Sequence, residues 1–266
     1  MTDWDPQLYH RFRRYRAEPF AAMLDRLKLQ ADERIIDLGC GTGENTIEIV
    51  RQTVHGTGLG IDSSPAMIDG AIKAMENLDP GIARRVRFVR QDFRDFRADR
   101  EYTLVFSNAA LQWVPDHRPV LAASYAALAP GGRLAFQIPS NETETAQQSM
   151  LVVAARDRWR ERLADARLPG LYVRPLEEYR QMLTGIGFVN LDCYYRTFEH
   201  PMTGPAEVIE WSRATSMRPF LERLTPAERT QFEADLLLEL EHGYATRGPL
   251  IFPFRRMFLW ARRPLA

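Results

Sequence analysis

Three aspartates, Asp37, Asp62 and Asp92, each stand at the end of a short apolar segment. The first is followed by three glycines at alternate positions: Gly39, Gly41 and Gly43. Glycines leave a turn without side chains, so a ligand can approach the backbone closely. An acid about twenty residues after such a turn, as Asp62 is, can accept hydrogen bonds from the two hydroxyls of a ribose. These residue types predict a nucleoside-binding site.

The charges around this turn restrict the kind of ligand. A dinucleotide site places a pyrophosphate at the start of the helix after the glycines. Here Glu44 occupies that start and Asp37 precedes the turn, so a pyrophosphate would be repelled. This opposes a NAD-dependent oxidoreductase and favours a ligand with a positive centre and no phosphate. Asp92 beside Phe93 provides an acceptor and an aromatic wall for adenine, and S-adenosylmethionine combines all these features.

Alternating strands and helices are needed to bring the aspartates together. Short apolar segments predict strands at 34–38, 57–62, 86–92, 102–108 and 133–139. Between them lie helical patterns near 44–52, 65–76 and 117–128. This alternation predicts a doubly covered, mostly parallel sheet, an α/β Rossmann-like fold. The carboxyl ends of parallel strands share one edge of such a sheet, where these folds bind ligands.

The pattern changes at both ends of the chain. Asp5 is predicted to cap a first helix, and a second helix is expected from Pro19 to about residue 29. After residue 139 we expect helices at 143–167, 175–186, 205–218 and 225–243, and strands at 190–198 and 256–263. We therefore predict one compact domain in three stretches: helices that close the cofactor site (1–30), a binding core (31–139), and remaining strands with a helical insertion over the acceptor site (140–266).

Composition excludes several classes of protein. The 35 basic and 35 acidic residues cancel and the sequence pI is about 7.0, so there is no overall field for nucleic acid or an anionic membrane. Two cysteines, Cys40 and Cys193, and no long apolar run predict a reduced, cytoplasmic protein. Five scattered histidines and two distant cysteines form no metal-ligand pattern, so no metal is expected. Cys40 is expected to be a packing residue.

The segment DLGCGTG, the acids that end later strands, and LAPGGRLAF (128–136) resemble the class I S-adenosylmethionine-dependent methyltransferases. More narrowly, MTDWDPQLY, GIDSSPAMI, FSNAALQWVPDH and ATSMRPFL are similar to the trans-aconitate 2-methyltransferase family. The resemblance covers nearly the whole chain. It implies a seven-stranded sheet with an antiparallel last strand, and methyl transfer from S-adenosylmethionine to a carboxylate of trans-aconitate, which gives a monomethyl ester and S-adenosylhomocysteine.

The resemblance also implies roles for particular residues. The methionine part of the cofactor would lie in the turn from Asp37 to Gly43, the ribose against Asp62 and Ser63, and the adenine against Asp92 and Phe93. Arg16 of the N-terminal helix and Asn108 at the end of the fourth strand would also contact the cofactor. Gln112 and Trp113 would face the methyl group that is transferred.

Chemistry indicates how the acceptor would be held. A carboxylate is ionised at pH 7 and needs no general base, so no catalytic residue is expected. It does need counter-charge, which arginine supplies bidentately. The candidates are Arg218 and Arg256, with Arg196 and Arg255 in reserve, and the aromatic rim would be Tyr9, Tyr15 and Trp113. The segment PFRRMF departs from the family's pattern, which has one arginine beside a proline.

Other interpretations stay open at this point. Trp113 is equally well explained as core packing. Arg218 would otherwise interact with a helix C-terminus, and Arg256 would be a solubilising charge on an edge strand. The enzyme would otherwise methylate another acid, such as a malonyl group on acyl carrier protein, or the chain would be a non-catalytic S-adenosylmethionine-binding module. A monomer or a small homo-oligomer is expected.

Overall fold

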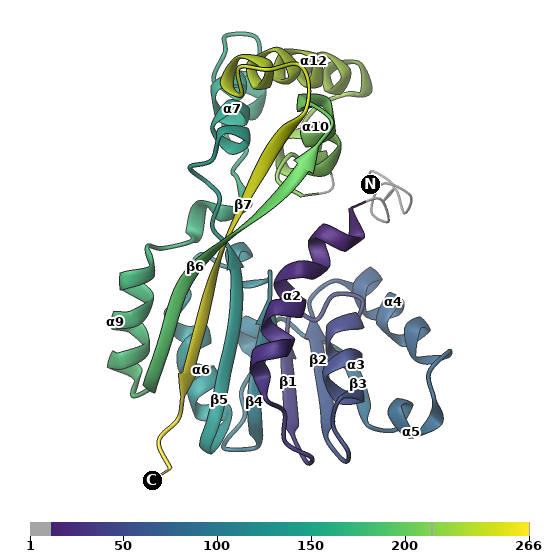
Figure 1. Ribbon diagram of the computed structural model, residues 1–266, viewed down its shortest axis with the longest axis vertical. Coiled ribbons are helices and arrows are strands. Elements are labelled where there is room, and N and C mark those ends of the chain that lie inside the picture. The colour runs from purple at the N-terminus through teal and green to yellow at the C-terminus, as the bar shows by residue number, and fades with distance from the viewer. Residues whose placement is uncertain (1–11, 214, 266) are drawn as a thin grey trace. The chain divides into compact units, whose positions relative to one another are not determined.

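A seven-stranded sheet organises the chain, in the order β3-β2-β1-β4-β5-β7-β6 (Figure 1). The computed structural model describes residues 12–213 and 215–265. The strands are β1 (Arg34–Leu38), β2 (Thr57–Asp62), β3 (Val86–Arg90), β4 (Tyr102–Asn108), β5 (Leu128–Pro139), β6 (Val189–Met202) and β7 (Leu250–Arg262). The first five pair in parallel, which confirms the predicted Rossmann-like fold.

The last strand runs against its neighbour, as the resemblance implies. Gly131 N donates to Arg263 O at 3.1 Å, and Ser140 N donates to Arg255 O at 3.0 Å. Because the residue number rises along β5 while it falls along β7, the two strands are antiparallel. The parallel strands are mostly buried. Four of the five residues of β1 and four of the seven residues of β4 are buried, as expected for a sheet covered by helices.

The helices between these strands follow the predicted positions, except for the short α5 (Pro80–Ala83), which was not predicted. They are α3 (Glu44–Arg51), α4 (Pro65–Met75), α5 (Pro80–Ala83) and α6 (Arg118–Ala127), with 3-10 turns η1 (Phe93–Asp95) and η2 (Leu111–Trp113). Ser64 caps α4 by accepting from Met67 N, and Pro65 occupies the first position. Polar capping residues and prolines at these starts explain why the boundaries could be read from sequence.

The N-terminal helix differs from its prediction. A single helix, α2 (Arg13–Leu27), runs through Pro19, where a second helix was expected to begin. Proline inside a helix removes one backbone hydrogen bond. Pro19, Met23 and Leu27 are buried at intervals of four residues, so packing along one face stabilises the helix across this defect. The cap predicted at Asp5 lies outside the described residues.

Two of the later helices are shorter than predicted: the one at 143–167 is divided, and the one at 205–218 ends at Arg213. The stretch 143–167 forms α7 (Thr145–Ala154) and α8 (Arg160–Leu163), followed by η3 (Pro169–Tyr172) and α9 (Leu176–Ile186). Trp159, between α7 and α8, is buried, and its Nε1 donates to Asp235 at 2.8 Å. The break between the helices thus accompanies a buried aromatic anchor. The remaining helices are α10 (Pro205–Arg213), α11 (Arg218–Leu221) and α12 (Pro226–Gly243), and α12 begins with a capping box formed by Thr225 and Glu228.

Two compact units share the chain. Unit 1 contains the described residues up to Glu18, Pro139–Leu171 and Thr197–Arg256, and unit 2 contains Pro19–Ile138, Tyr172–Arg196 and Met257 onward. This organisation differs from the expected three consecutive stretches of one domain, although a boundary falls at 139 in both. The reason is that α2, β6 and β7 each continue from one unit into the other.

Each unit has its own apolar core. In unit 1, α7, α10 and α12 gather around neighbouring ends of β6 and β7, with Trp159, Trp211 and Phe232 buried among them (Figure 1). In unit 2, the sheet strands pack with α6 and α9, and Tyr179 and Leu183 are fully buried.

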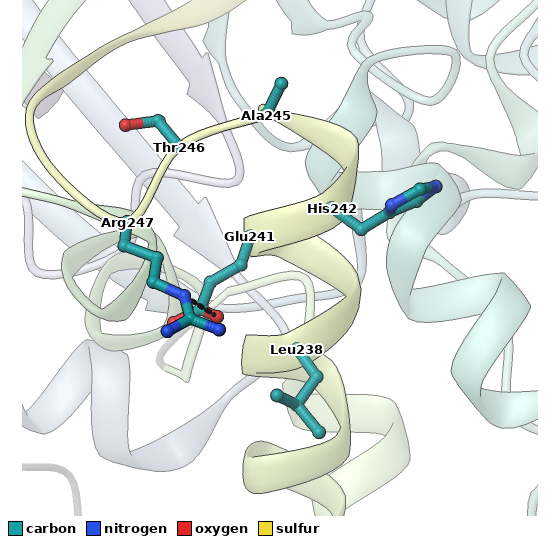
Figure 2. Close-up of a pocket in the computed structure, with 6 residues that line it drawn as sticks. All are labelled: Leu238, Glu241, His242, Ala245, Thr246 and Arg247. Atoms are coloured by element: carbon teal, nitrogen blue, oxygen red, sulfur yellow. Dashed lines mark ion pairs between the residues drawn. The ribbon is translucent and has the colours of Figure 1, made fainter.

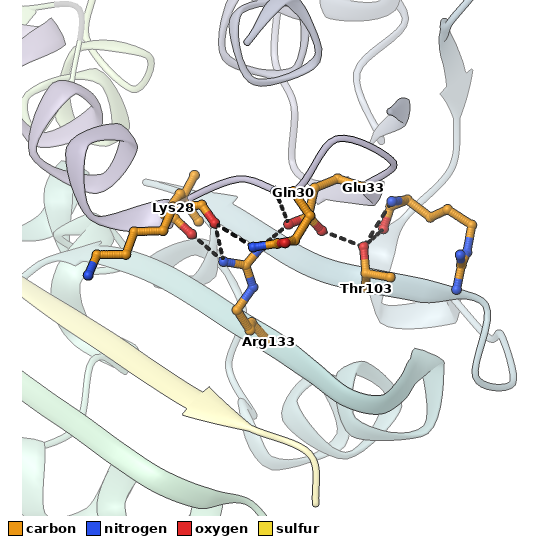
Figure 3. Close-up of polar contacts among 7 residues, drawn as sticks. Lys28, Gln30, Glu33, Thr103 and Arg133 are labelled. Atoms are coloured by element: carbon orange, nitrogen blue, oxygen red, sulfur yellow. Dashed lines mark hydrogen bonds and ion pairs between the residues drawn. The ribbon is translucent and has the colours of Figure 1, made fainter. Parts of the chain in front are cut away.

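A buried ion pair closes the amino-terminal edge of the sheet (Figure 3). Glu33, which is 1% exposed, accepts from Arg133 Nη2, from Thr103 Oγ1 and from the Gln30 backbone N–H at 3.0 Å. Arg133 also donates to backbone carbonyls of Leu27 and Lys28 at the end of α2. This network joins α2, β1, β4 and β5 at the edge opposite to the strand-end aspartates.

Candidate functional site

The glycine turn between β1 and α3 has a backbone that only glycine adopts readily. Gly39, Gly41 and Gly43 have φ values of 78°, 54° and 78°. A methyl group added at Gly39 would overlap Ala110, and one at Gly43 would overlap Phe88. At Gly41 the same methyl group would meet no atom within 4 Å. Two glycines therefore allow close packing, and the middle one borders open space that a ligand can approach.

Asp62, at the end of β2, is tied to this turn. Its Oδ2 accepts from Gly41 N at 3.0 Å and its Oδ1 accepts from Ser64 N at 2.9 Å. Each carboxylate oxygen has a second lone pair, so the half-buried Asp62 keeps acceptor capacity for two ligand hydroxyls. Ser63 is exposed next to it. The structure thus brings Asp62 and Gly41 together as the spacing predicted.

Asp37 lies inside the protein at the end of β1. Its side chain is 1% exposed, and Thr46 Oγ1 of α3 donates to it at 2.6 Å. Burial, aided by the charge of Asp62 and opposed by the Thr46 hydrogen bond, raises the pKa of Asp37 to about 7. Its influence on a ligand in the glycine turn is therefore electrostatic, from a position beneath the loop surface.

Phe93 and Asp92 stand at the end of β3. The Phe93 ring would lie 3.5 Å from a methyl group on Gly39, so it forms a wall beside the glycine turn. Asp92 caps η1 and accepts from Arg94 N at 2.9 Å, and its carboxylate pairs with Arg94 Nη2 at 2.5 Å. Its hydrogen bonds to Arg94 lower the pKa of Asp92. The sequence analysis did not anticipate this local ion pair.

The end of β4 presents oxygen acceptors. Ala109 takes the left-handed conformation, with φ 56°, and its carbonyl accepts from Gln112 Nε2 at 2.6 Å. This contact fixes the orientation of the Gln112 amide. Asn108 Oδ1 and Gln112 Oε1 are buried and have no hydrogen-bond partner among the described residues. Two buried acceptors without a described partner suit a ligand that brings hydrogen-bond donors.

The exposure of Trp113 decides between its two interpretations, as a core residue or as a residue that contacts a ligand. Its side chain is 52% exposed, so the interpretation as ordinary core packing is wrong. Gln112, beside it, is 5% exposed because its amide is engaged inside the turn. An exposed indole at the carboxyl end of β4 is available to contact a ligand.

Two of the arginine candidates have local partners. Arg218, on α11, is largely exposed, and its Nε donates to Glu222 at 2.7 Å. Arg255 donates to Ser140 O at 2.7 Å and to Thr143 Oγ1 at 3.2 Å, so it orders the loop after β5. Both side chains therefore have structural contacts that an acceptor anion would share or displace.

The other two arginines contrast in burial. Arg196 is exposed on β6, the edge strand of the sheet. Arg256, on β7, is only 6% exposed, and its guanidinium lies 3.8 Å from the centre of the Phe254 ring. Since β7 lies between β5 and β6, the interpretation of Arg256 as an edge-strand solubility charge is wrong. A buried cation of this kind is typical of an anion site.

The N-terminal candidates are described in part. Tyr15, in α2, packs on His200 with ring centres 4.5 Å apart, and on Trp211 at 6.3 Å. Arg16 belongs to α2, but its side chain is not among those described, and Tyr9 lies outside the described residues.

His200 is a residue that the sequence analysis missed. It is fully buried on β6 beside Tyr15, Trp211 and Phe254. The signal was the alternation of Phe198, His200 and Met202, which places all three on one face of a strand. A histidine in a run of buried alternating residues indicates a polar group inside an apolar core.

A separate pocket lies at the end of α12 and contains none of the predicted site residues (Figure 2). It is lined by Leu238, Glu241, His242, Ala245, Thr246 and Arg247. Arg247 pairs with Glu241 at 3.0 Å, so this pocket has little surplus charge for an anion. Within residues 12–213 and 215–265, no helix is long and apolar enough to cross a membrane.

Comparison with known proteins agrees with this fold. Residues 9–192 match the family described as a methyltransferase domain. The YcgJ protein from Bacillus subtilis has a similar structure, with a TM-score of 0.62 and 15% identity over 92% of this chain and 97% of that chain. Haemonchus contortus phosphoethanolamine N-methyltransferase 2 has a TM-score of 0.57 and 18% identity over 92% of this chain, which spans about half (52%) of that chain. The class is therefore a methyltransferase of Rossmann-like fold.

Full-length relatives narrow the class. A trans-aconitate 2-methyltransferase from Methylobacterium radiotolerans is 34% identical over 99% of both chains. One from Streptomyces avermitilis is 37% identical over 99% of this chain and 98% of its own. The chain belongs to the trans-aconitate 2-methyltransferase family.

Proposed function

We propose that this chain transfers a methyl group from S-adenosylmethionine to a carboxylate of a small polycarboxylic acid, trans-aconitate, to give a monomethyl ester and S-adenosylhomocysteine. The observation that carries this proposal is the end-to-end match to relatives of that name, which includes the segments of both units. Fold likeness alone would not specify a substrate.

The turn between β1 and α3 fits this cofactor. Gly41 borders open space, and the side-chain oxygens of Asn108 and Gln112 are buried acceptors with no partner in the described part of the chain. Together with Asp37 they favour a ligand with an ammonium and a sulfonium over one with a pyrophosphate. The sulfonium supplies an activated methyl group, so no residue is required to activate the donor.

We assign the contacts with the cofactor as follows. The backbone from Gly39 to Gly43 borders the methionine part, Asp62 accepts from the ribose hydroxyls beside Ser63, and Phe93 forms the wall against adenine. Asp92 would accept from the adenine amine while it shares its oxygens with Arg94. The carboxylate of the cofactor is assigned to Arg16, and the backbone of Asn108 to its amino group.

The acceptor needs alignment more than acid or base catalysis. A carboxylate is ionised at neutral pH, so it attacks the methyl carbon in line without losing a proton. Arg256, buried beside Phe254, supplies counter-charge in a low-dielectric setting, and Arg218 supplies a second, exposed charge. Arg196 and Arg255 are the second-choice candidates for binding the acceptor carboxylates. Tyr9, Tyr15 and Trp113 are assigned to the aromatic rim, with Gln112 and Trp113 facing the methyl group.

A cytoplasmic location and a monomer or small homo-oligomer remain proposals from the sequence. They are compatible with the two cysteines, Cys40 and Cys193, which are both free and buried. A small-molecule partner follows from the family, and no nucleic-acid partner is proposed because the net charge is zero.

The proposal is tested in two steps on the purified chain. Equilibrium binding should detect S-adenosylmethionine and S-adenosylhomocysteine but not NAD. An acceptor screen with labelled methyl donor should then give turnover with trans-aconitate above other di- and tricarboxylic acids. Absence of cofactor binding would overturn the main interpretation. Turnover restricted to carrier-bound malonyl groups would replace the substrate, and cofactor binding without any turnover would indicate a non-catalytic module.

A further inference from the structure

His200 is a buried polar group that the fold of unit 1 does not explain. Its side chain is 0% exposed, and neither Nδ1 nor Nε2 has a hydrogen-bond partner among the described residues. Buried polar atoms in folded proteins are nearly always hydrogen-bonded, so each exception calls for a physical explanation. A strand position in an apolar core would be filled at lower cost by phenylalanine or leucine.

An aromatic cage fixes the orientation of this imidazole. The Tyr15 ring lies 4.5 Å from it with an interplanar angle of 32°, and the Trp211 ring lies 5.3 Å away at 31°. Phe254 adds a third ring at 6.0 Å. With its faces packed in this way, the imidazole can make polar contacts only through its ring edge, which carries the two nitrogens.

A buried cation belongs to the same cluster. The guanidinium of Arg256 lies over Phe254, whose ring also contacts His200. Burial and the charge of Arg256 lower the pKa of His200 to about 4, so the imidazole is neutral at pH 7 with one N–H donor and one acceptor nitrogen. Among the described residues, the other titratable groups beside it are Tyr15 and Glu18. The Glu18 carboxylate is 4.0 Å from Nδ1, beyond hydrogen-bond distance, and is partly exposed.

We propose that His200 is a specificity residue for the acceptor: together with Arg256 it binds one carboxylate of the polycarboxylic acid, and its ring N–H donates to a carboxylate oxygen. This inference rests on the proposed function and deepens it. An ionised carboxylate only accepts hydrogen bonds, so a guanidinium and a neutral N–H donor inside an apolar cage match it. A monocarboxylic acid whose single carboxylate is the one methylated would leave this pair unfilled, which disfavours its binding.

Substitution of His200 by phenylalanine separates this role from a structural one. In His200→Phe the ring still fills the aromatic cage, but the N–H donor is absent. The expected result is a rise of about tenfold to a hundredfold in the KM for trans-aconitate, the range for loss of a hydrogen bond to a charged group. The Kd for trans-aconitate in the presence of S-adenosylhomocysteine should rise equally, with the cofactor Kd unchanged. The Tm should stay level or increase, because an unsatisfied polar group has been removed.

His117 provides the matched control. It is also buried, but its Nδ1 lies 2.5 Å from the Tyr179 hydroxyl. His117→Phe breaks that hydrogen bond, so its Tm should fall. A lower Tm in His117→Phe but not in His200→Phe would show that the His117 hydrogen bond stabilises the fold and that His200 makes no comparable contact with the described residues.

A second variant keeps the inference testable if His200→Phe does not fold. His200→Gln retains a donor and should keep more acceptor affinity than His200→Phe or, in its absence, His200→Leu. The inference is overturned if His200→Phe binds trans-aconitate like the wild type, if its Tm falls while its KM is unchanged, or if Gln loses as much affinity as the apolar variants. If the wild type itself binds cofactor but methylates no polycarboxylic acid, the proposed function fails first, before any variant is measured.

Discussion

A carboxylate that carries a proton near neutrality is the main electrostatic feature of the glycine turn. Burial raises the pKa of Asp37 from 3.8 to about 7. Between these values the folded chain binds more protons than the unfolded chain, so the contribution of Asp37 to the free energy of unfolding falls as pH rises from about 4 to 7. We expect Asp37→Asn to reduce this loss.

Urea unfolding of wild type and Asp37→Asn at pH 5 and pH 7.5 checks this expectation. The comparison is the difference between the two proteins at each pH, because other groups titrate in both. If Asp37→Asn shows the same decline as the wild type, the carboxyl is not protonated in the folded state. With the proposed cofactor, whose cationic centres favour the charged form of Asp37, binding should release a proton near pH 7 and calorimetry in two buffers would detect it.

Position at the end of a strand was enough to identify Asp62 and Phe93 beside the glycine turn. Such positions are local in sequence, and parallel strands bring their ends together regardless of detail. The partners of polar side chains were not readable in this way. The Asp92–Arg94 ion pair and the contact of Gln112 with Ala109 depend on rotamers, and the caged His200 depends on neighbours distant in the chain.

The turn between β1 and α3 contains glycines with two different functions. Gly39 has no room for a methyl group because Ala110 packs against it, whereas Gly41 borders open space. Both have positive φ, so alanine at either position is strained by roughly 1 kcal/mol. Gly39→Ala should therefore destabilise the fold well beyond this strain, while Gly41→Ala should fold with a modest loss.

Cofactor binding distinguishes the two variants further. We expect Gly41→Ala to lose S-adenosylmethionine affinity by about tenfold or more despite its intact fold, because the new methyl group occupies ligand space. Thermal unfolding and equilibrium dialysis measure the two effects. Equal loss of stability in both variants, with normal cofactor affinity in Gly41→Ala, would contradict this division of roles.

The ion pair between Glu33 and Arg133 joins α2, β1, β4 and β5 at the amino-terminal edge of the sheet, opposite to the glycine turn (Figure 3). Arg133→Met would leave the buried Glu33 charge uncompensated, and we expect a loss of about 3–5 kcal/mol in the free energy of unfolding. The matched control is Arg34→Met, an exposed arginine at the start of β1, which should cost less than about 1 kcal/mol. Urea denaturation of both measures the difference, and similar losses would refute the assigned role of the buried pair.

Element boundaries were predictable where capping residues mark them, as at Ser64 and Thr225. They were not predictable where packing decides. Helix α2 continues through Pro19 because its buried face stabilises it, and β7 begins at Leu250, six residues before the predicted start. Local propensity is a weak signal compared with burial of a whole face.

At the scale of the molecule, the candidate residues divide between the two units. The turn with Asp62 and Phe93 belongs to unit 2, whereas Arg218 and Arg256 belong to unit 1. We expect Arg256→Gln to raise the KM for trans-aconitate by at least tenfold and Arg218→Gln by less, because the first is buried and the second is solvent-screened. Neither should alter the Kd for S-adenosylmethionine.

Asp62→Ala is the reciprocal control, since it should weaken cofactor binding by removing a ribose acceptor and a contact with Gly41. Steady-state kinetics and calorimetry on the three variants check the division. Arginine variants with wild-type acceptor kinetics would exclude these two side chains from the acceptor site.

The sequence was sufficient for the class of fold, the positions of the first five strands along the chain and the cofactor class, because periodicity, glycine spacing and strand-end acids are local patterns with fixed geometric consequences. Tertiary structure was required to show that Trp113 is exposed, that Arg256 is buried and that His200 lies in an aromatic cage with no hydrogen bond to the described residues. Burial depends on which segments, distant in the sequence, pack over a residue. Here α2, β6 and β7 each contribute residues to both units, and their sequences alone do not show what packs against them.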